Sequence, residues 1–185
     1  WQLLTASDGQ EVRGVQEIVE TVFQVPVSLG TVAALEQEMS AALAPAHTEA
    51  GQAVREAPAK NVDETGWKQA GQKRWLWAAA TATVAFFVIH ARRNWQGLQA
   101  LLGATIHGIV GSDRWSVYNK VALHLRQLCW AHLRRDFRKC VDRGGSAVAI
   151  GQAGLKAVED VFRLWWDFRQ RQVSRAELRT GLEPV

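Results

Sequence analysis

The sequence predicts a mixed α/β fold, in which a helical N-terminal segment precedes a sheet with helices on its faces. Three observations support this fold class. Apolar residues among the first 59 positions recur at helical spacing. Three short apolar segments follow within residues 60–91 and are typical of strands in hairpins. After residue 94, helical and strand patterns alternate, as expected where helices connect strands of one sheet.

The first 59 residues predict helices. Apolar spacing favours a helix over 14–23, and Ser28 is a suitable N-cap for a second one. Pro45 and Pro58 are expected to bracket a third helix over 46–57. The second helix has an apolar face made of Val32, Leu35, Met39 and Leu43. Two helices across a short turn resemble a helix-turn-helix, but this second helix carries two Glu and no base. We therefore favour a packing or dimerising role, with DNA contact as the alternative.

Strand and helix patterns then alternate up to residue 172. Strands are expected over 60–69, 73–81, 83–91, 106–113 and 123–129, with a tight connection at Gly71-Gln72. Helices are expected over 95–102, between the cap Asn94 and the stop Gly103, and over 130–141 and 147–172. The inward positions of the last helix are Leu155, Val158, Phe162 and Trp165. This order suits a ribonuclease-H-like domain among other α/β folds, and fold alone does not assign a function.

Charge is distributed unevenly along the chain. Residues 1–59 carry a net charge of −6, whereas residues 60–185 carry +10. A basic region indicates a polyanionic partner, most commonly nucleic acid, and the alternative is a solvated basic surface. No signal-peptide pattern is visible, and the longest apolar run (75–89) is short for a membrane span. We therefore expect a cytoplasmic protein without a membrane partner, in which the two Cys are reduced.

Two aspartates are candidates for chemistry. Asp63 lies within the first expected strand, and Asp113 lies where the fourth one ends. If these strands are neighbours, both carboxylates meet at one edge of the sheet, where their repulsion favours a cation between them. Oxygen ligands suit Mg²⁺ or Mn²⁺, and two-metal sites with a third acid serve in-line attack at phosphodiesters. The alternative is structural, with Asp63 in a turn and Asp113 as a cap or a partner of Arg114. Glu64 is expected to point to the opposite face from Asp63.

Four local motifs occur in one order across residues 60–140: NVDETGWK, a hydrophobic hairpin, GSDRWSVY and QLCWAHLRRDF. Together they resemble the transposases of the insertion-sequence-66 family, and the upstream SLGTV and ALAP resemble the segment before its catalytic domain. The resemblance implies a ribonuclease-H-like core of the DDE type, with Asp63 and Asp113 as the first two catalytic acids and metal ligands. It also implies Mg²⁺ or Mn²⁺ as cofactors, and cleavage and transfer of DNA strands.

The same resemblance sets expectations for partners and completeness. Expected partners are transposon ends and target DNA, with homo-oligomers or accessory transposition proteins, in the bacterial cytoplasm and nucleoid. The family's third acid, a Glu behind a helical insertion, has no clear counterpart among Glu159, Glu177 and Glu183. We interpret the chain as a transposase fragment that ends before this acid, with a helical segment (1–59), a partial core (60–145) and the start of the insertion (146–185). The rivals are a nuclease of the same fold and a non-catalytic DNA-binding or regulatory remnant.

Further residues are candidates for DNA contact. Cys129 and His132 have C-x-x-H spacing but too few partners for zinc, and by resemblance to other transposases His132 lies near the active site. The alternative for His132 is packing at a helix start. A basic stripe on helix 130–141 consists of Arg134, Arg135, Arg138 and Lys139. It either binds phosphates or is simply solvated. Trp67 and Trp115 follow the acids closely and either stack an unpaired base or support the core. Trp75 and Trp77 are expected in the core.

Overall fold

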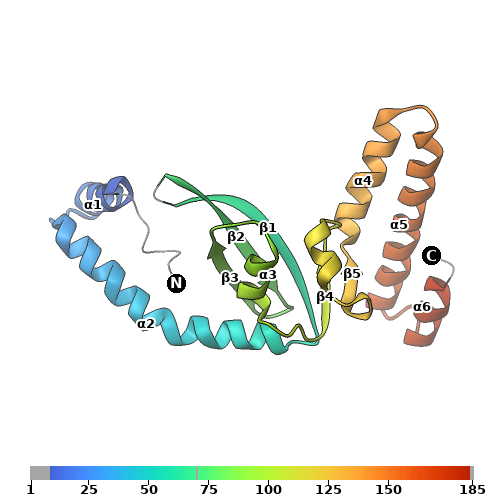
Figure 1. The fold of residues 1–185 in the computed structure, drawn as a ribbon, viewed down its shortest axis with the longest axis horizontal. Helices are drawn as coiled ribbons and strands as arrows, with labels where there is room; N and C mark the ends of the chain where they lie inside the picture. Colours follow the sequence, from blue (N-terminus) through green and yellow to red (C-terminus); the bar gives the residue numbers. More distant parts are fainter. Residues whose placement is uncertain (1–8, 70, 184–185) are drawn as a thin grey trace. The chain divides into compact units, whose positions relative to one another are not determined.

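The computed structural model describes residues 9–69 and 71–183, and it confirms the mixed α/β class (Figure 1). By their internal contacts the residues form two compact units, which meet in the sequence between Gln127 and Leu128. Each unit is described by itself. The boundaries predicted at 59/60 and 145/146 stay predictions. None of the helices in the described ranges is long and apolar enough to cross a membrane.

The first unit begins with two helices, α1 (Gly9–Phe23) and α2 (Leu29–Glu56). Gln24 ends α1 with a positive φ of 57°. Ser28 caps α2 as predicted, because its side chain accepts a hydrogen bond of 3.0 Å from the backbone N–H of Thr31. The apolar face predicted for the second helix is largely uncovered, since Leu35, Met39 and Leu43 are exposed.

The predicted break at Pro45 is wrong, because α2 continues through it. Proline has a φ that a helix accepts, but it lacks the N–H that would otherwise donate to the carbonyl four residues earlier, that of Ala41. The second half of α2 compensates by packing: Gly51 and Val54 are buried, and a Cβ on Gly51 would lie 2.9 Å from the ring of Phe86. Tertiary contacts therefore override the local signal of the proline.

A five-stranded mixed sheet with the order β3-β2-β1-β4-β5 follows. Its strands are β1 (Ala59–Gln69), β2 (Gln72–Ala80), β3 (Ala85–His90), β4 (Ile109–Ser112) and β5 (Arg126–Leu128). Strands β1, β2 and β3 form antiparallel pairs, whereas β1 and β4 are parallel. The last two strands are shorter than predicted. Leu123–Leu125 forms a 3₁₀ turn instead of the start of a strand, and Leu123 is exposed.

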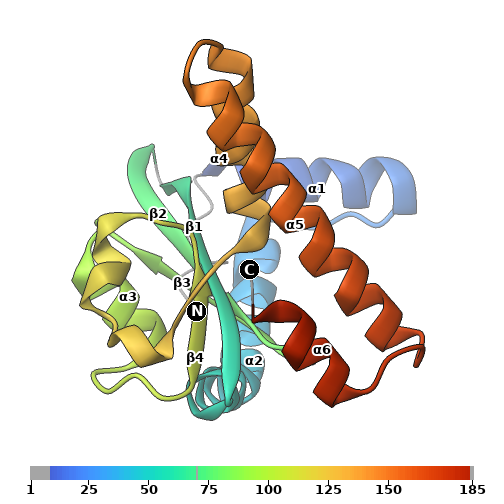
Figure 2. The same cartoon turned by 90° about the vertical axis from the view of Figure 1, so that its right-hand side faces the viewer.

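The core of this unit lies on one face of the sheet. Register places Val62, Ala79 and Phe86 side by side on this face, and α2 and α3 (Trp95–Leu102) cover it (Figure 2). Trp77, which was predicted to be a core residue, is fully buried, and a Cβ on Gly97 of α3 would lie 2.6 Å from its ring. The caps of α3 at Asn94 and Gly103 are those predicted.

Two cations, Lys60 and Arg55, bind backbone carbonyls at the ends of helices. Lys60 of β1 is only 3% exposed, and its ammonium donates to the carbonyls of Arg55 (2.8 Å) and His107 (2.7 Å). Arg55 itself donates to the carbonyls of Leu101 and Ala100 at the end of α3. Carbonyls at a helix C-terminus lack intrahelical partners and carry partial negative charge, so both cations stabilise helix ends.

The second unit consists of α4 (Trp130–Arg143), α5 (Ala147–Arg169) and α6 (Arg175–Leu182). Helices α4 and α5 approach closely, because Gly154 of α5 lies directly against the ring of Phe137. The prediction that Phe162 and Trp165 point inward is wrong, since they are 46% and 45% exposed. The buried residues of α5 are Gly151, Val158 and Val161, so its inward face includes the predicted Val158 but is turned away from Phe162 and Trp165.

Candidate active site

The parallel pairing of β1 with β4 brings Asp63 and Asp113 to one level of the sheet. The last paired residues are Asn61 and Gly111, and each aspartate lies two residues further along its own chain segment. Asp63 is still within β1, where it pairs with Ala78 of β2, and Asp113 is the first residue after β4. The strand adjacency that the sequence interpretation required is therefore present.

The two carboxylates differ in how firmly they are held. Asp113 is half-buried, and its Oδ1 accepts a 2.9 Å hydrogen bond from the backbone N–H of Trp115. Asp63 is exposed, and its Oδ1 accepts from the backbone N–H of Glu64 at 3.0 Å. One oxygen of each aspartate is thus oriented by the backbone. Carboxylate oxygens in this environment suit a hard divalent cation.

Glu64 points away from Asp63, into the face that the helices cover. Its side chain is 1% exposed and forms an ion pair with Arg93, whose Nη2 lies 2.6 Å from Oε1. Its second oxygen accepts a hydrogen bond from the hydroxyl of Tyr118. This buried carboxylate is fully engaged by the protein, so it is a structural neighbour of the candidate site, as predicted.

The pKa values of Glu64 and Tyr118 depend on the nearby aspartates. Burial raises the pKa of Glu64, and the charge of Asp113 acts in the same direction, while hydrogen bonds from Tyr118 and Arg93 oppose it. The pKa of Tyr118 is raised, first by burial and then by its hydrogen bond to Glu64, with further contributions from Asp113 and Asp63. Three carboxylates therefore act on one hydroxyl, which stays protonated and donates.

Arg93 is held between aromatic rings. Its guanidinium lies 4.1 Å from the ring centroid of Trp115 and 5.2 Å from that of Trp75. Trp115 also packs edge-on to Tyr118, with ring centroids 5.9 Å apart. The predicted DNA-contact role of Trp115 stays a prediction, and its observed contacts are those of core support. Sequence reasoning did not pair Arg93 or Tyr118 with Glu64, although the tyrosine stands in the motif GSDRWSVY.

In the part of the chain that the structure describes, no third acid joins the two aspartates. Within the described ranges, no three His, Cys, Asp or Glu side chains are grouped to hold a metal ion. Glu177 caps α6 instead, because its Oε2 accepts from the backbone N–H of Ser174 at 2.7 Å, a bond that lowers the pKa of Glu177. Glu159 is exposed on α5. The two aspartates fit a divalent cation in chemistry but supply only part of a coordination sphere.

The remaining predicted DNA contacts lie on α4, in the second unit. The basic stripe is exposed and consists of Arg134, Arg135, Arg138 and Lys139. Lys139 lies 3.5 Å from Asp136 on the same helix. His132, in the first turn, has a buried Nδ1 for which the described residues provide no hydrogen-bond partner. Their roles in DNA binding stay predictions.

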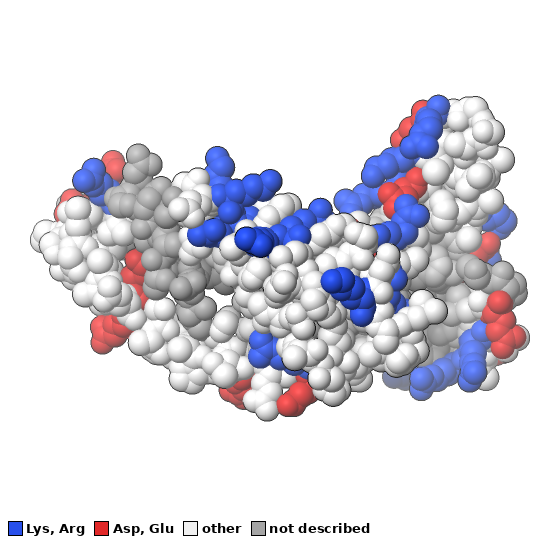
Figure 3. Space-filling model, viewed as in Figure 1, with Lys and Arg blue, Asp and Glu red and all other residues white. Residues whose placement is uncertain are grey.

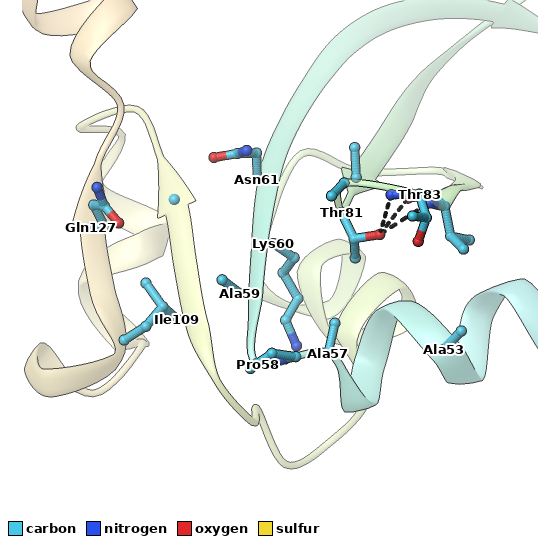
Figure 4. A pocket seen from close by; sticks show the side chains of 14 residues that line it. Ala53, Ala57, Pro58, Ala59, Lys60, Asn61, Thr81, Thr83, Ile109 and Gln127 are labelled. Carbon is cyan, nitrogen blue, oxygen red and sulfur yellow. Dashed lines mark hydrogen bonds between the residues drawn. The ribbon is translucent and has the colours of Figure 1, made fainter. Parts of the chain in front are cut away.

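A pocket of about 730 Å³ opens beside the base of β1 (Figure 4). Asn61, Thr81 and Ile109 line it together with several alanines, and neither aspartate does. Lys60 contributes to the wall, but its ammonium is bound to backbone carbonyls. The pocket therefore offers little charge to a ligand, and the candidate chemistry lies two residues further along β1.

The fold and the site define a mixed α/β protein with one carboxylate in β1 and another directly after the adjacent parallel strand β4. The chain belongs to the IS66 family of transposases, because the family model described as "Transposase IS66 family" matches residues 7–183. Neither the curated proteins nor the solved structures gave a match. Membership supports a transposase-type function and implies DNA as the partner.

Proposed function

We propose that this chain carries two of the metal ligands of a transposase that cleaves and transfers DNA strands, and that these ligands are Asp63 and Asp113. The observation that carries the proposal is the β1–β4 register: Asp63 in β1 and Asp113 directly after β4 each follow the last paired residues by two positions. In a ribonuclease-H-like arrangement the scissile phosphate would bind beside these two positions, at the middle of the sheet.

The residues of the chain have distinct tasks in this proposal. Asp63 and Asp113 would hold Mg²⁺ or Mn²⁺, which when bound activates the attacking oxygen and stabilises the leaving one. The backbone N–H of Trp115 orients Asp113, so that its second oxygen can bind a cation. Cleavage forms a P–O bond from water and breaks the bond to the 3′ oxygen, which leaves with a proton as a 3′-hydroxyl. In strand transfer that hydroxyl forms a new P–O bond at a target phosphodiester, and the target's own 3′ oxygen leaves with the proton as a 3′-hydroxyl.

The first test is metal binding by the chain itself. Titration with Mn²⁺, followed by electron paramagnetic resonance of the free ion, should reveal a weak site, because two carboxylates supply few ligands. Asp63→Asn and Asp113→Asn should each abolish this site. Glu159→Gln, which changes an exposed carboxylate of α5, should leave it intact. Equal binding by the parent and both Asp variants would refute the assignment.

The second test is activity on DNA. Since no third acid joins the pair in the described residues, we expect little or no nicking of supercoiled DNA in Mg²⁺ or Mn²⁺. Any nicking should disappear in Asp63→Ala and in Asp113→Ala. Nicking that persists in both variants would contradict the catalytic assignment. Joined products in a strand-transfer assay would distinguish a transposase from a nuclease of the same fold.

A non-catalytic role is the second candidate function, and it is favoured because no third acid is grouped with the aspartates among the described residues. A chain that binds DNA without cutting it would compete with an intact transposase for the same sites. This role predicts DNA binding that is unchanged in Asp63→Ala, together with no cleavage by the parent chain. Cleavage that depends on both aspartates would exclude it.

A further inference from the structure

The β1–β2 hairpin extends beyond the covered part of the sheet, and its end is cationic and aromatic. Lys68 pairs directly with Lys73, and Trp67 pairs directly with Arg74. Residues 67–74 contain three bases and no acid. Figure 3 shows Lys and Arg side chains gathered over the region of β1 and β2, whereas acidic side chains lie along α1 and α2.

The arrangement of these charges is unfavourable for the hairpin alone. Like charges directly opposite each other on two strands destabilise the pair. Among the described residues, no carboxylate forms an ion pair with Lys68, Lys73 or Arg74. The guanidinium of Arg74 donates a hydrogen bond to the neutral side chain of Gln72. Lys73 lies over the ring of Trp75, 5.2 Å from its centroid. An anionic partner would offset this repulsion.

Trp67 is placed differently from the other tryptophans of the sheet. It is 38% exposed, whereas Trp77 is fully buried and Trp75 packs against the core. Because side chains alternate along a strand, Trp67 lies on the same face of β1 as Asp63. Four residues at the rise of a strand separate the two by about 13 Å, or about four base steps of duplex DNA.

We propose that the end of the β1–β2 hairpin binds an unpaired DNA segment beside the phosphate that Asp63 and Asp113 address. Trp67 stacks on a base, since an exposed indole can stack on any base whose face is free. Arg74, across from Trp67 on the same face, binds a flanking phosphate, and the Lys68–Lys73 pair, on the opposite face, binds phosphates where the DNA strand passes round the end of the hairpin. The location of this contact relative to the cut rests on the proposed function, but the contact itself does not require catalysis.

The test is the affinity of the full chain for fluorescent oligonucleotides, measured by anisotropy in EDTA. Trp67→Ala should weaken binding to a partly single-stranded DNA roughly tenfold or more, the size of effect that loss of a stacking aromatic produces. Trp67→Phe should retain most of the affinity. The double variant Lys68→Gln/Lys73→Gln should lower the slope of log affinity against log salt by about 1.4, at about 0.7 for each phosphate contact of a single strand.

The matched control is Lys156→Gln, which removes an exposed lysine of α5 that pairs with Asp160 at 3.0 Å. It should bind like the parent chain, and circular dichroism should show all variants folded. Unchanged binding by the hairpin variants, an equal effect of Trp67→Ala on fully paired DNA, or no DNA binding at all would overturn the proposal. Because the affinity is measured in EDTA, it does not depend on the metal site, so failure of the metal site and failure of the hairpin contact are distinguishable.

Discussion

Adjacent acids in NVDETGW have opposite environments, and the alternation of a β-strand is the reason. Asp63 faces away from the covered face and stays exposed, while Glu64 lies under the helices and is bound by Arg93 and Tyr118. A buried charge needs such partners, because an unpaired one would be strongly destabilising. Arg93 of this network packs on the ring of Trp115, and the backbone N–H of Trp115 donates to Asp113. Trp115 therefore connects the packing around Glu64 with the candidate site.

The raised pKa of Glu64 predicts a pH dependence of stability. Below its ordinary pKa of 4.5, Glu64 is protonated in both the folded and the unfolded state. Between the ordinary pKa and the raised pKa of the folded state, the folded chain keeps a proton on Glu64 that the unfolded chain has lost. The free energy of unfolding therefore falls as the pH rises through this range. Glu64→Gln removes this contribution. The difference between the parent and Glu64→Gln should therefore decrease over this range and be constant above it.

Urea unfolding followed by tryptophan fluorescence, at intervals from pH 4 upward, measures this difference. Subtracting the variant removes the contributions of other titrating groups. A difference that grows with pH would mean that the bonds from Arg93 and Tyr118 outweigh burial, contrary to the direction given above.

Helix α2 shows at the scale of an element how packing overrides propensity. Proline inside a helix costs about 3 kcal/mol relative to alanine, yet α2 continues past Pro45 to deliver Gly51 and Val54 to the core. Pro45→Ala should therefore raise the free energy of unfolding by about 1–3 kcal/mol, less than the full propensity difference because proline also restricts the unfolded chain. Thermal or urea unfolding measures this effect, and a destabilised variant would show that Pro45 shapes a bend that the packing needs.

Local signals made most elements predictable. The caps Ser28, Asn94 and Gly103 are correct because capping depends on neighbouring backbone groups. The strand bearing Asp63 was also predictable, because its pattern is contained in a short stretch of the sequence. The pairings of Glu64 with Tyr118 and Arg93 were not, because they join residues 54 and 29 positions apart, which only the folded sheet brings together. Phe162 and Trp165 were misjudged because one apolar stripe on α5 does not reveal which side a neighbouring helix covers.

At the scale of the whole molecule, the division of charge between residues 1–59 and 60–185 does not coincide with a division in packing. The acidic segment includes the end of α2, and that end is part of the core: Val54 is fully buried, and Gly51 contacts Phe86 of β3. Lys60 and Arg55 add hydrogen bonds that link α2, α3 and β1. The change in charge at residue 60 is therefore a boundary in composition inside one packed unit.

This packing predicts how the chain responds to shortening. A chain that starts at residue 60 loses Val54, the cover of Phe86 and one of the two carbonyls that Lys60 binds, that of Arg55. It should therefore lose cooperative unfolding of the sheet. A chain that starts at Ser28 keeps α2 and its cap, so it should unfold like the parent within about 1 kcal/mol. Circular dichroism, urea unfolding and limited proteolysis of both chains check this prediction. A stable, protease-resistant chain from residue 60 would show that the sheet folds without α2 and that the boundary at 59/60 is a true domain boundary.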